Sequence, residues 1–202
     1  MAREKDVRCV GGSVVLKLPA GFERPLSPVC RMLLGETVGM HEARRYTANV
    51  TPGTGNLIVH RNLFDEIGLF DEELNVRGED TDLFLRIFRR GYESWYAPAA
   101  VVEHVIPPER LSDEYLCRLA DLMAVGMAES DRDHWGARLY PFVWLARVVQ
   151  AAVLFVPRLA WARLRRDTER ALGARCRLSI ARKYLSDGMQ LLLRRPLGER
   201  PA

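Results

Sequence analysis

The segment Leu63–Tyr92 reads LFDEIGLFDEELNVRGEDTDLFLRIFRRGY, and its two halves differ in character. The first half alternates short apolar runs with acidic residues, whereas the second begins with Gly78, Glu79 and Asp80 and continues as an amphipathic run. Apolar residues in that run recur at helical spacing, at Leu83, Phe84, Ile87 and Phe88. This periodicity predicts a helix over residues 81–90.

The predicted helix has its own stabilising and terminating signals. Asp82 and Arg86 stand four residues apart, a spacing at which opposite charges pair on a helix surface. Gly91 is expected to end the helix, because glycine adopts the left-handed conformation at little cost. A shorter helix is predicted over 62–68, with Asn62 as its cap and Gly68 as its end.

Outside this segment, the first half of the chain alternates strand and loop patterns. Residues 7–18 predict a strand pair or a bulged strand around Gly11-Gly12, and residues 56–60 and 92–104 predict further strands. Residues 19–28 contain three prolines and are expected to form a loop. A short helix is expected near residues 29–36.

From Arg110 onward the pattern is helical. Ser112, followed by two acidic residues, predicts the start of a helix that runs through Met127. Residues 141–157 are mostly apolar, and 172–193 carry one apolar stripe on a basic helix. We therefore predict an α/β fold with a mixed sheet, followed by a helical extension.

The composition supports this division into two parts and indicates the cellular compartment of the protein. The chain has 202 residues, 48% of them hydrophobic, which suffices for a domain over 1–109 and an extension over 110–202. The four cysteines form no C-x-x-C pair, which favours free thiols in a reducing compartment. Because residues 1–6 are charged and no apolar core follows them, no secretory signal is expected, and we predict a cytoplasmic protein.

Charge is distributed unevenly along the chain. The net charge is −4 over residues 1–157 and +8 over residues 158–202. A basic segment of this density suits an anionic partner, either a membrane or a nucleic acid. Only Tyr184 is aromatic after Trp161, so stacking on bases has little support and no nucleic-acid partner is expected.

Several motifs occur in a recognisable order. They are GTGNLIVHRNLFDEIGLFDEEL (53–74), RGEDTDLFLRIFRRG (77–91) and YAPAAVVEH (96–104). Together they resemble the second half of the inverting family 2 glycosyltransferases of A-type fold, whose pattern runs G-x-N, F--IGGFDE-L, GED-DL--R----G and Y-P-A-V-H. The carboxyl-terminal galactosyltransferase domain is similar as well. Leu69 departs from the pattern, because the family usually has a second glycine there.

The resemblance implies roles for five residues. Asp80 would be the general base that takes the proton of an acceptor hydroxyl, and Glu79 would bind or orient the acceptor. Gly55 and Asn56 would line the acceptor side of the cleft. His104 would lie near the diphosphate as a metal ligand. From the residues alone, Glu79 and Asp80 also suit a helix start, where each carboxylate gains about 0.3–1 kcal/mol, and His104 suits an ordinary hydrogen-bonded histidine.

The resemblance also implies a nucleotide-sugar donor, a glycan or lipid-linked acceptor, and Mg²⁺ or Mn²⁺ in the complete enzyme. The family's first half, with its D-x-D motif, has no counterpart here, since the Asp-x-Asp spacings at 80–82 and 131–133 lie elsewhere in the pattern. A divalent ion on a diphosphate needs several oxygen ligands. We therefore expect a partial A-type domain with little or no activity alone. The chain suits a fragment, a truncated reading frame, or the acceptor half of a split enzyme whose partner chain supplies the nucleotide-binding half.

Two alternatives stay open. Residues 141–157 are shorter than a typical span of about 20 residues and contain Arg147. They therefore suit a spanning helix, a buried helix, or a helix at the inner face of the cytoplasmic membrane. The chain as a whole suits either a transferase or a non-catalytic interaction or membrane-docking module derived from one.

Overall fold

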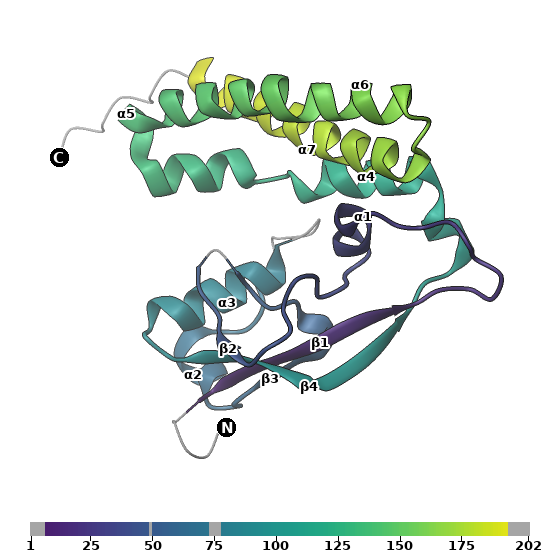
Figure 1. Cartoon of the computed structure of the whole chain (residues 1–202). Helices are drawn as coiled ribbons and strands as arrows, with labels where there is room; N and C mark the ends of the chain where they lie inside the picture. The colour runs from purple at the N-terminus through teal and green to yellow at the C-terminus, as the bar shows by residue number, and fades with distance from the viewer. Residues whose placement is uncertain (1–6, 49, 73–77, 194–202) are drawn as a thin grey trace. The chain divides into compact units, whose positions relative to one another are not determined.

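The computed structural model describes residues 7–48, 50–72 and 78–193 (Figure 1). The chain divides into two compact units, one of Met1–Phe22 with Leu34–Pro108 and one of Glu23–Leu33 with Glu109–Ala202. The sequence suggested one boundary near residue 109. The structure also groups Glu23–Leu33 with the later helices.

A four-stranded mixed sheet forms the centre of the first unit. Its strands are β1 (Cys9–Lys17), β2 (Arg44–Arg45), β3 (Leu57–Val59) and β4 (Ser94–Val105), in the order β2-β4-β1-β3. The long strands β1 and β4 run parallel, whereas the two edge strands are antiparallel to their neighbours. This mixed sheet and the helices that follow it confirm the predicted α/β fold with a helical carboxyl-terminal part.

The pairing of β1 with β4 is interrupted once. Gly12 pairs with Ala97, but the next residue, Ser13, pairs with Val101, so β4 contains three extra residues. Pro98, which lacks an N–H group, falls among those residues, where no ladder hydrogen bond is required. The sequence predicted an irregularity around Gly11-Gly12; it lies there, with the additional residues on the opposite strand.

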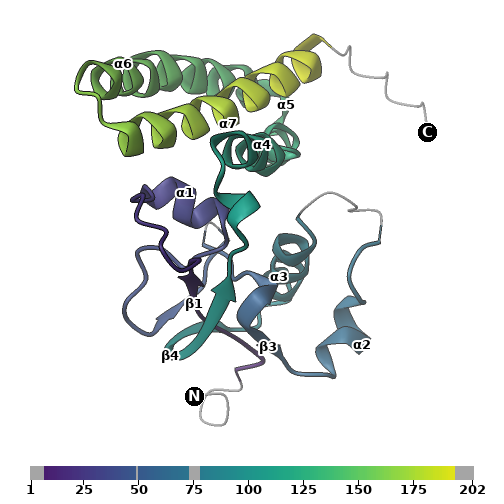
Figure 2. The same cartoon turned by 90° about the vertical axis from the view of Figure 1, so that its right-hand side faces the viewer.

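Helices cover one face of the sheet (Figures 1 and 2). They are α2 (Leu63–Ile67) and α3 (Glu79–Arg89). Leu83 and Ile87 of α3 form a buried cluster with Cys9 and Leu63, and Phe84 packs with Tyr46 and Tyr96. The predicted amphipathic helix is confirmed, although it begins two residues earlier than expected. Its predicted end is also confirmed, because Gly91 is left-handed with φ 81°.

One capping prediction is wrong. Asn62 precedes α2, but its backbone is already helical (φ −63°, ψ −16°) and its side chain makes no capping hydrogen bond. A capping side chain normally reaches the helix from an extended backbone. The first amide of α2, on Leu63, donates to His60 O instead. The segment LFDEEL (69–74), which the sequence would assign to a turn after Gly68, lies partly outside the described residues, at 73 and 74.

The second unit is helical. Its helices are α1 (Pro28–Leu33), α4 (Asp113–Met123), α5 (Met127–Gln150), the π-helical turn η3 (Ala151–Phe155), α6 (Val156–Leu164) and α7 (Thr168–Leu193). The predicted start at Ser112 is confirmed, since its hydroxyl accepts a hydrogen bond from Tyr115 N at 3.2 Å. The predicted end at Met127 is wrong. Helix α4 stops at Met123, and left-handed Gly126 separates it from α5.

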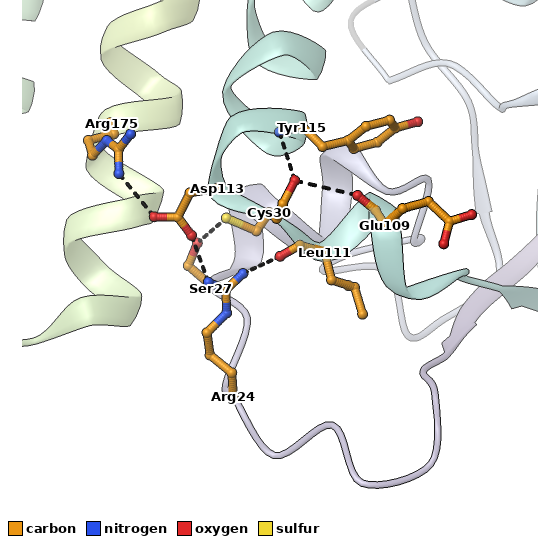
Figure 3. Close-up of polar contacts among 9 residues, drawn as sticks. Arg24, Ser27, Cys30, Glu109, Leu111, Asp113, Tyr115 and Arg175 are labelled. Atoms are coloured by element: carbon orange, nitrogen blue, oxygen red, sulfur yellow. Dashed lines mark hydrogen bonds and ion pairs between the residues drawn. The ribbon is translucent and has the colours of Figure 1, made fainter.

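A charged cluster joins three segments of this unit (Figure 3). Asp113 accepts from Arg24 Nη1 at 2.6 Å through one oxygen and from Arg175 Nη1 at 3.0 Å through the other. Arg24 also donates to Leu111 O. Because the two arginines come from the loop before α1 and from α7, Asp113 fastens both segments to the start of α4.

Helices α5 and α6 pack along α7. Trp144 Nε1 donates to Leu185 O at 3.0 Å, and a Cβ placed on Gly188 would lie 2.4 Å from Tyr140 Oη. In the described residues, one helical stretch, Asp113–Leu164, is long and apolar enough to cross a membrane, and 11% of its most apolar window is buried. This stretch is compatible with membrane association, and residues 141–157 form part of it.

Candidate active site

The first turn of α3 presents two carboxylates. Gly78, just before it, is left-handed with φ 107°, a conformation that residues with side chains rarely adopt. Glu79 is exposed and Asp80 half-buried. Asp80 Oδ1 accepts a hydrogen bond from Thr81 N at 2.7 Å. The turn therefore holds one oxygen of Asp80 and leaves Oδ2 for other partners.

That second oxygen faces a loop of small residues. A Cβ placed on Gly53 would lie 3.6 Å from Asp80 Oδ2, so the carboxylate stands against the turn before the short 3₁₀ helix η1 (Thr54–Asn56). A Cβ placed on Gly55 would meet nothing within 4 Å. Because residue 53 is glycine, it adds no side chain beside Asp80 Oδ2, the oxygen that an acceptor hydroxyl must reach if Asp80 acts as a general base.

Asn56 closes this loop and braces the sheet. Its Nδ2 donates to Ser13 O at 2.9 Å and to Ala100 O at 2.8 Å, so it joins β1 and β4 where their pairing is interrupted. The amide nitrogen is thus engaged within the protein. Contact between Asn56 and an acceptor stays a prediction, as does the role of Gly55.

His104 lies farther along β4. It pairs with Leu16 in register, and its Nδ1 lies 3.4 Å from a Cβ placed on Gly35. Four residues of extended strand separate it from Ala100, about 13 Å. The structure therefore brings Asp80 together with the 53–56 loop. It places His104 away from the hydrogen bonds of Asn56 with Ser13 and Ala100. Its predicted role as a metal ligand stays a prediction.

The described residues do not provide a divalent-metal site on their own. They contain no group of three or more His, Cys, Asp or Glu side chains able to hold an ion. Mg²⁺ and Mn²⁺ prefer several oxygen ligands, and one imidazole does not supply them. The donor set here therefore does not fit the ion that the resemblance implies.

Arg86 is a positioning residue whose role the sequence showed only in part. The predicted pair is confirmed, with Arg86 Nε 2.8 Å from Asp82 Oδ2. The guanidinium also donates to the backbone oxygens at the end of α2, at 2.6 Å to Ile67 O and 2.9 Å to Leu69 O. Arg86 thus ties the helix that carries Asp80 to the segment before Phe70. Its spacing from Asp82 was readable in the sequence, but its backbone partners were not.

Replacing Arg86 by alanine is expected to lower the free energy of unfolding by about 1.5–3 kcal/mol, because charged hydrogen bonds to the half-buried carbonyl of Ile67 and the exposed carbonyl of Leu69 are lost together with the Asp82 pair. Arg86→Lys keeps the charge near Asp82 but cannot reach several carbonyls at once, so it should recover only part of the loss. Urea unfolding followed by circular dichroism measures both. Equal stability of the alanine variant and wild type would contradict this role.

Comparison with known proteins agrees with the motif order. The sequence pattern of a family described as "Glycosyltransferase like family 2" matches residues 1–120. No curated protein and no solved structure matched the chain. The matched region covers more than half of the chain and includes the whole sheet, α3 and the loop facing Asp80. The chain belongs to the family 2-like glycosyltransferases.

Proposed function

We propose that this chain is the acceptor-side half of an inverting transferase that moves a sugar from a nucleotide-sugar to an acceptor hydroxyl. The observation that carries the proposal is the position of Asp80 within the family match. Its carboxylate lies in the first turn of α3 beside Gly53 of the 53–56 loop, within the region that the family pattern matches. Membership of the family supports nucleotide-sugar and acceptor substrates in general.

The chemistry assigned to this chain is proton transfer and positioning. Asp80 Oδ2 takes the proton of the acceptor hydroxyl as that oxygen bonds to the anomeric carbon. The bond from that carbon to the diphosphate breaks, its electron pair leaves with the nucleoside diphosphate, and the anomeric configuration inverts. Thr81 N–H steadies the other oxygen of Asp80, and Glu79 orients the acceptor from the same turn. A divalent ion, when bound, would offset charge on the departing diphosphate.

A partner chain is proposed to supply the nucleotide-binding half. Both Asp-x-Asp spacings in this chain contain an aspartate that is already engaged. Asp82 pairs with Arg86, and Asp131 accepts from Tyr184 Oη at 2.9 Å and lies 3.6 Å from Arg147. Neither pair is therefore free to act as the D-x-D of the family, which supports a metal site completed elsewhere.

The proposed acceptor is a lipid-linked or polysaccharide-linked glycan at the inner face of the cytoplasmic membrane. The long apolar helical stretch and the basic segment after residue 157 support this location. They also support the second candidate, a non-catalytic interaction or membrane-docking module. One residue of the sheet supports the non-catalytic module. Ile58, on edge strand β3, is 75% exposed and could pack against a partner.

Two measurements test these proposals, the first the need for a partner half and the second the choice between the transferase and the non-catalytic module. Calorimetric titration of the purified full chain with UDP-sugars and Mn²⁺ should show no saturable binding, and tight binding would refute the need for a partner half. Deletion of the gene in its own organism, followed by mass spectrometry of cellular glycans and lipid-linked sugars, should remove a glycosylated product. If all glycans persist unchanged, the transferase proposal fails and the non-catalytic module is favoured.

A further inference from the structure

An apolar stripe runs along the outer side of α5, η3 and α6. Its members recur every three or four residues, the spacing of one helix face, and each is between 52% and 71% exposed. They are Leu139, Phe142, Leu145, Val149, Val153 and Val156. The stripe is about 25 Å long at 1.5 Å per residue. Side chains of this size on solvent-exposed helix positions mark an interaction surface when they are contiguous.

The opposite side of the same helices is already occupied. Tyr140, Ala151 and Ala162, each eleven residues from the next, are buried. Tyr140 forms a cluster with Tyr184 and Leu191 of α7. Eleven residues make about three helical turns, so these residues share one side. The stripe is therefore the face that α7 does not cover.

The apolar run 141–157 contains one charged residue, Arg147, and its charge has partners within the helical unit. Arg147 lies 3.6 Å from Asp131 Oδ2, donates to Gln150 Oε1 at 3.3 Å, and stacks over the Tyr184 ring at 5.9 Å. Its charge is thus partnered within the unit. A lone arginine would otherwise oppose contact between this helix and hydrocarbon.

Exposed arginines mark the two ends of the stripe. Arg138 lies one helical turn before Phe142, and Arg163 lies seven residues, about two turns, after Val156, so both exposed arginines share the face of the stripe. Beyond it, Arg165 stacks over the Trp161 ring at 4.8 Å, which sets a cation beside an exposed indole. An apolar face bordered by arginine and tryptophan suits the boundary between lipid headgroups and acyl chains.

We propose that this stripe docks the helical unit onto an anionic bilayer, with α5 and α6 lying in the membrane interface and the bordering arginines contacting lipid phosphates. The proposal rests on the membrane location proposed above, but not on catalysis. It concerns binding to lipid as such, and the occupant is the bilayer rather than a second copy of the chain. Two copies facing each other would bring like-charged arginines together, whereas anionic lipid complements them.

The packing of α5 against α7 also distinguishes a helix that lies on the membrane from a helix that crosses it. Trp144 is bonded to Leu185, so the middle of α7 accompanies the stripe. If the stripe crossed the bilayer with this packing intact, Arg177, Arg182 and Lys183 of α7 would enter hydrocarbon as well. Arginine and lysine are strongly disfavoured there. An interfacial position instead leaves α7 on the aqueous side.

Vesicle flotation of the full chain tests this surface. We expect binding to phosphatidylcholine vesicles that contain phosphatidylglycerol, weaker binding without it, and weaker binding at high salt because charges are screened. Phe142→Gln combined with Val153→Gln should reduce partitioning by about tenfold or more. Val101→Gln combined with Val105→Gln is the matched control, since these side chains of the first unit are 55% and 66% exposed. It should bind as wild type does.

Three results would overturn the proposal. They are absence of flotation with anionic vesicles at low salt, equal loss in the control double variant, and retention of the chain in cell membranes after alkaline carbonate extraction, which would indicate a spanning helix. Concentration-dependent dimers without lipid binding would assign the stripe to a second copy instead. None of these measurements depends on a donor sugar, so failure here is distinct from failure of the transferase proposal.

Discussion

Replacing Asp80 by asparagine is expected to lower sugar transfer by about 10²–10⁴-fold, the usual contribution of a general base. Asparagine has nearly the same shape, and its carbonyl oxygen can still accept the hydrogen bond from Thr81 N. Its amide nitrogen, however, cannot take a proton at the place where Oδ2 faces the Gly53 loop. The loss should therefore be chemical, with the fold and α3 unchanged.

The measurement is incorporation of labelled sugar in extracts of cells that carry the variant at the native locus, so that any partner half is present. Asp65→Asn is the matched control, because Asp65 is exposed and also lies in the first turn of a helix, α2. It removes the same charge and should keep full activity. Full activity of Asp80→Asn would refute the assignment of Asp80 as the general base. An equal loss in both variants would indicate that the loss of one negative charge, at either site, lowers the activity.

Much of the first unit was readable because local signals and tertiary packing agree there. The helix predicted over 81–90 has a strong period in its apolar residues and a glycine after its end, and both match α3. Asn62 failed as a cap because residue preference alone cannot reveal that the backbone before α2 is already helical. Helix ends depend on such backbone geometry more than on composition.

The helical part was less predictable for a different reason. The sequence shows that residues 141–157 are apolar. However, an apolar helix face can pack against protein or against lipid, and the spacing of its apolar residues is the same in both cases. Only the packing of α7 in the structure shows which side of these helices is covered by protein. In the same way, the motif placed Asp80 at a helix start, whereas its position beside Gly53 and the two hydrogen bonds of Asn56 depend on residues that are far apart in sequence.

That brace leads to the largest expected effect on stability. A Cβ added to Gly12 would lie 2.2 Å from Asn56 Nδ2 and 2.3 Å from Ala100 O. Side-chain atoms do not tolerate such distances, and the Ala100 oxygen is backbone that cannot retreat without disturbing β4. Gly12→Ala should therefore cost about 3–5 kcal/mol, from overpacking and from the strained or lost Asn56 hydrogen bonds. This is a large part of the stability of a typical domain, about 5–15 kcal/mol.

A mutant cycle shows whether the clash or the hydrogen bonds dominate. Asn56→Ala alone should cost less than Gly12→Ala, since it removes two bonds but adds no atom. The double variant should stay unstable, because Ala100 O still meets the new methyl group, yet it should lose less than the sum of both single variants. Gly55→Ala, which meets nothing within 4 Å, is the control and should be nearly neutral. Hydrogen exchange in β1 and β4 peptides localises the effect, and protection in Gly12→Ala equal to that in Gly55→Ala would contradict the brace. If β1 and β4 do separate there, the loop that faces Asp80 loses its anchor, so the same variant should also lose transfer activity through a purely structural cause.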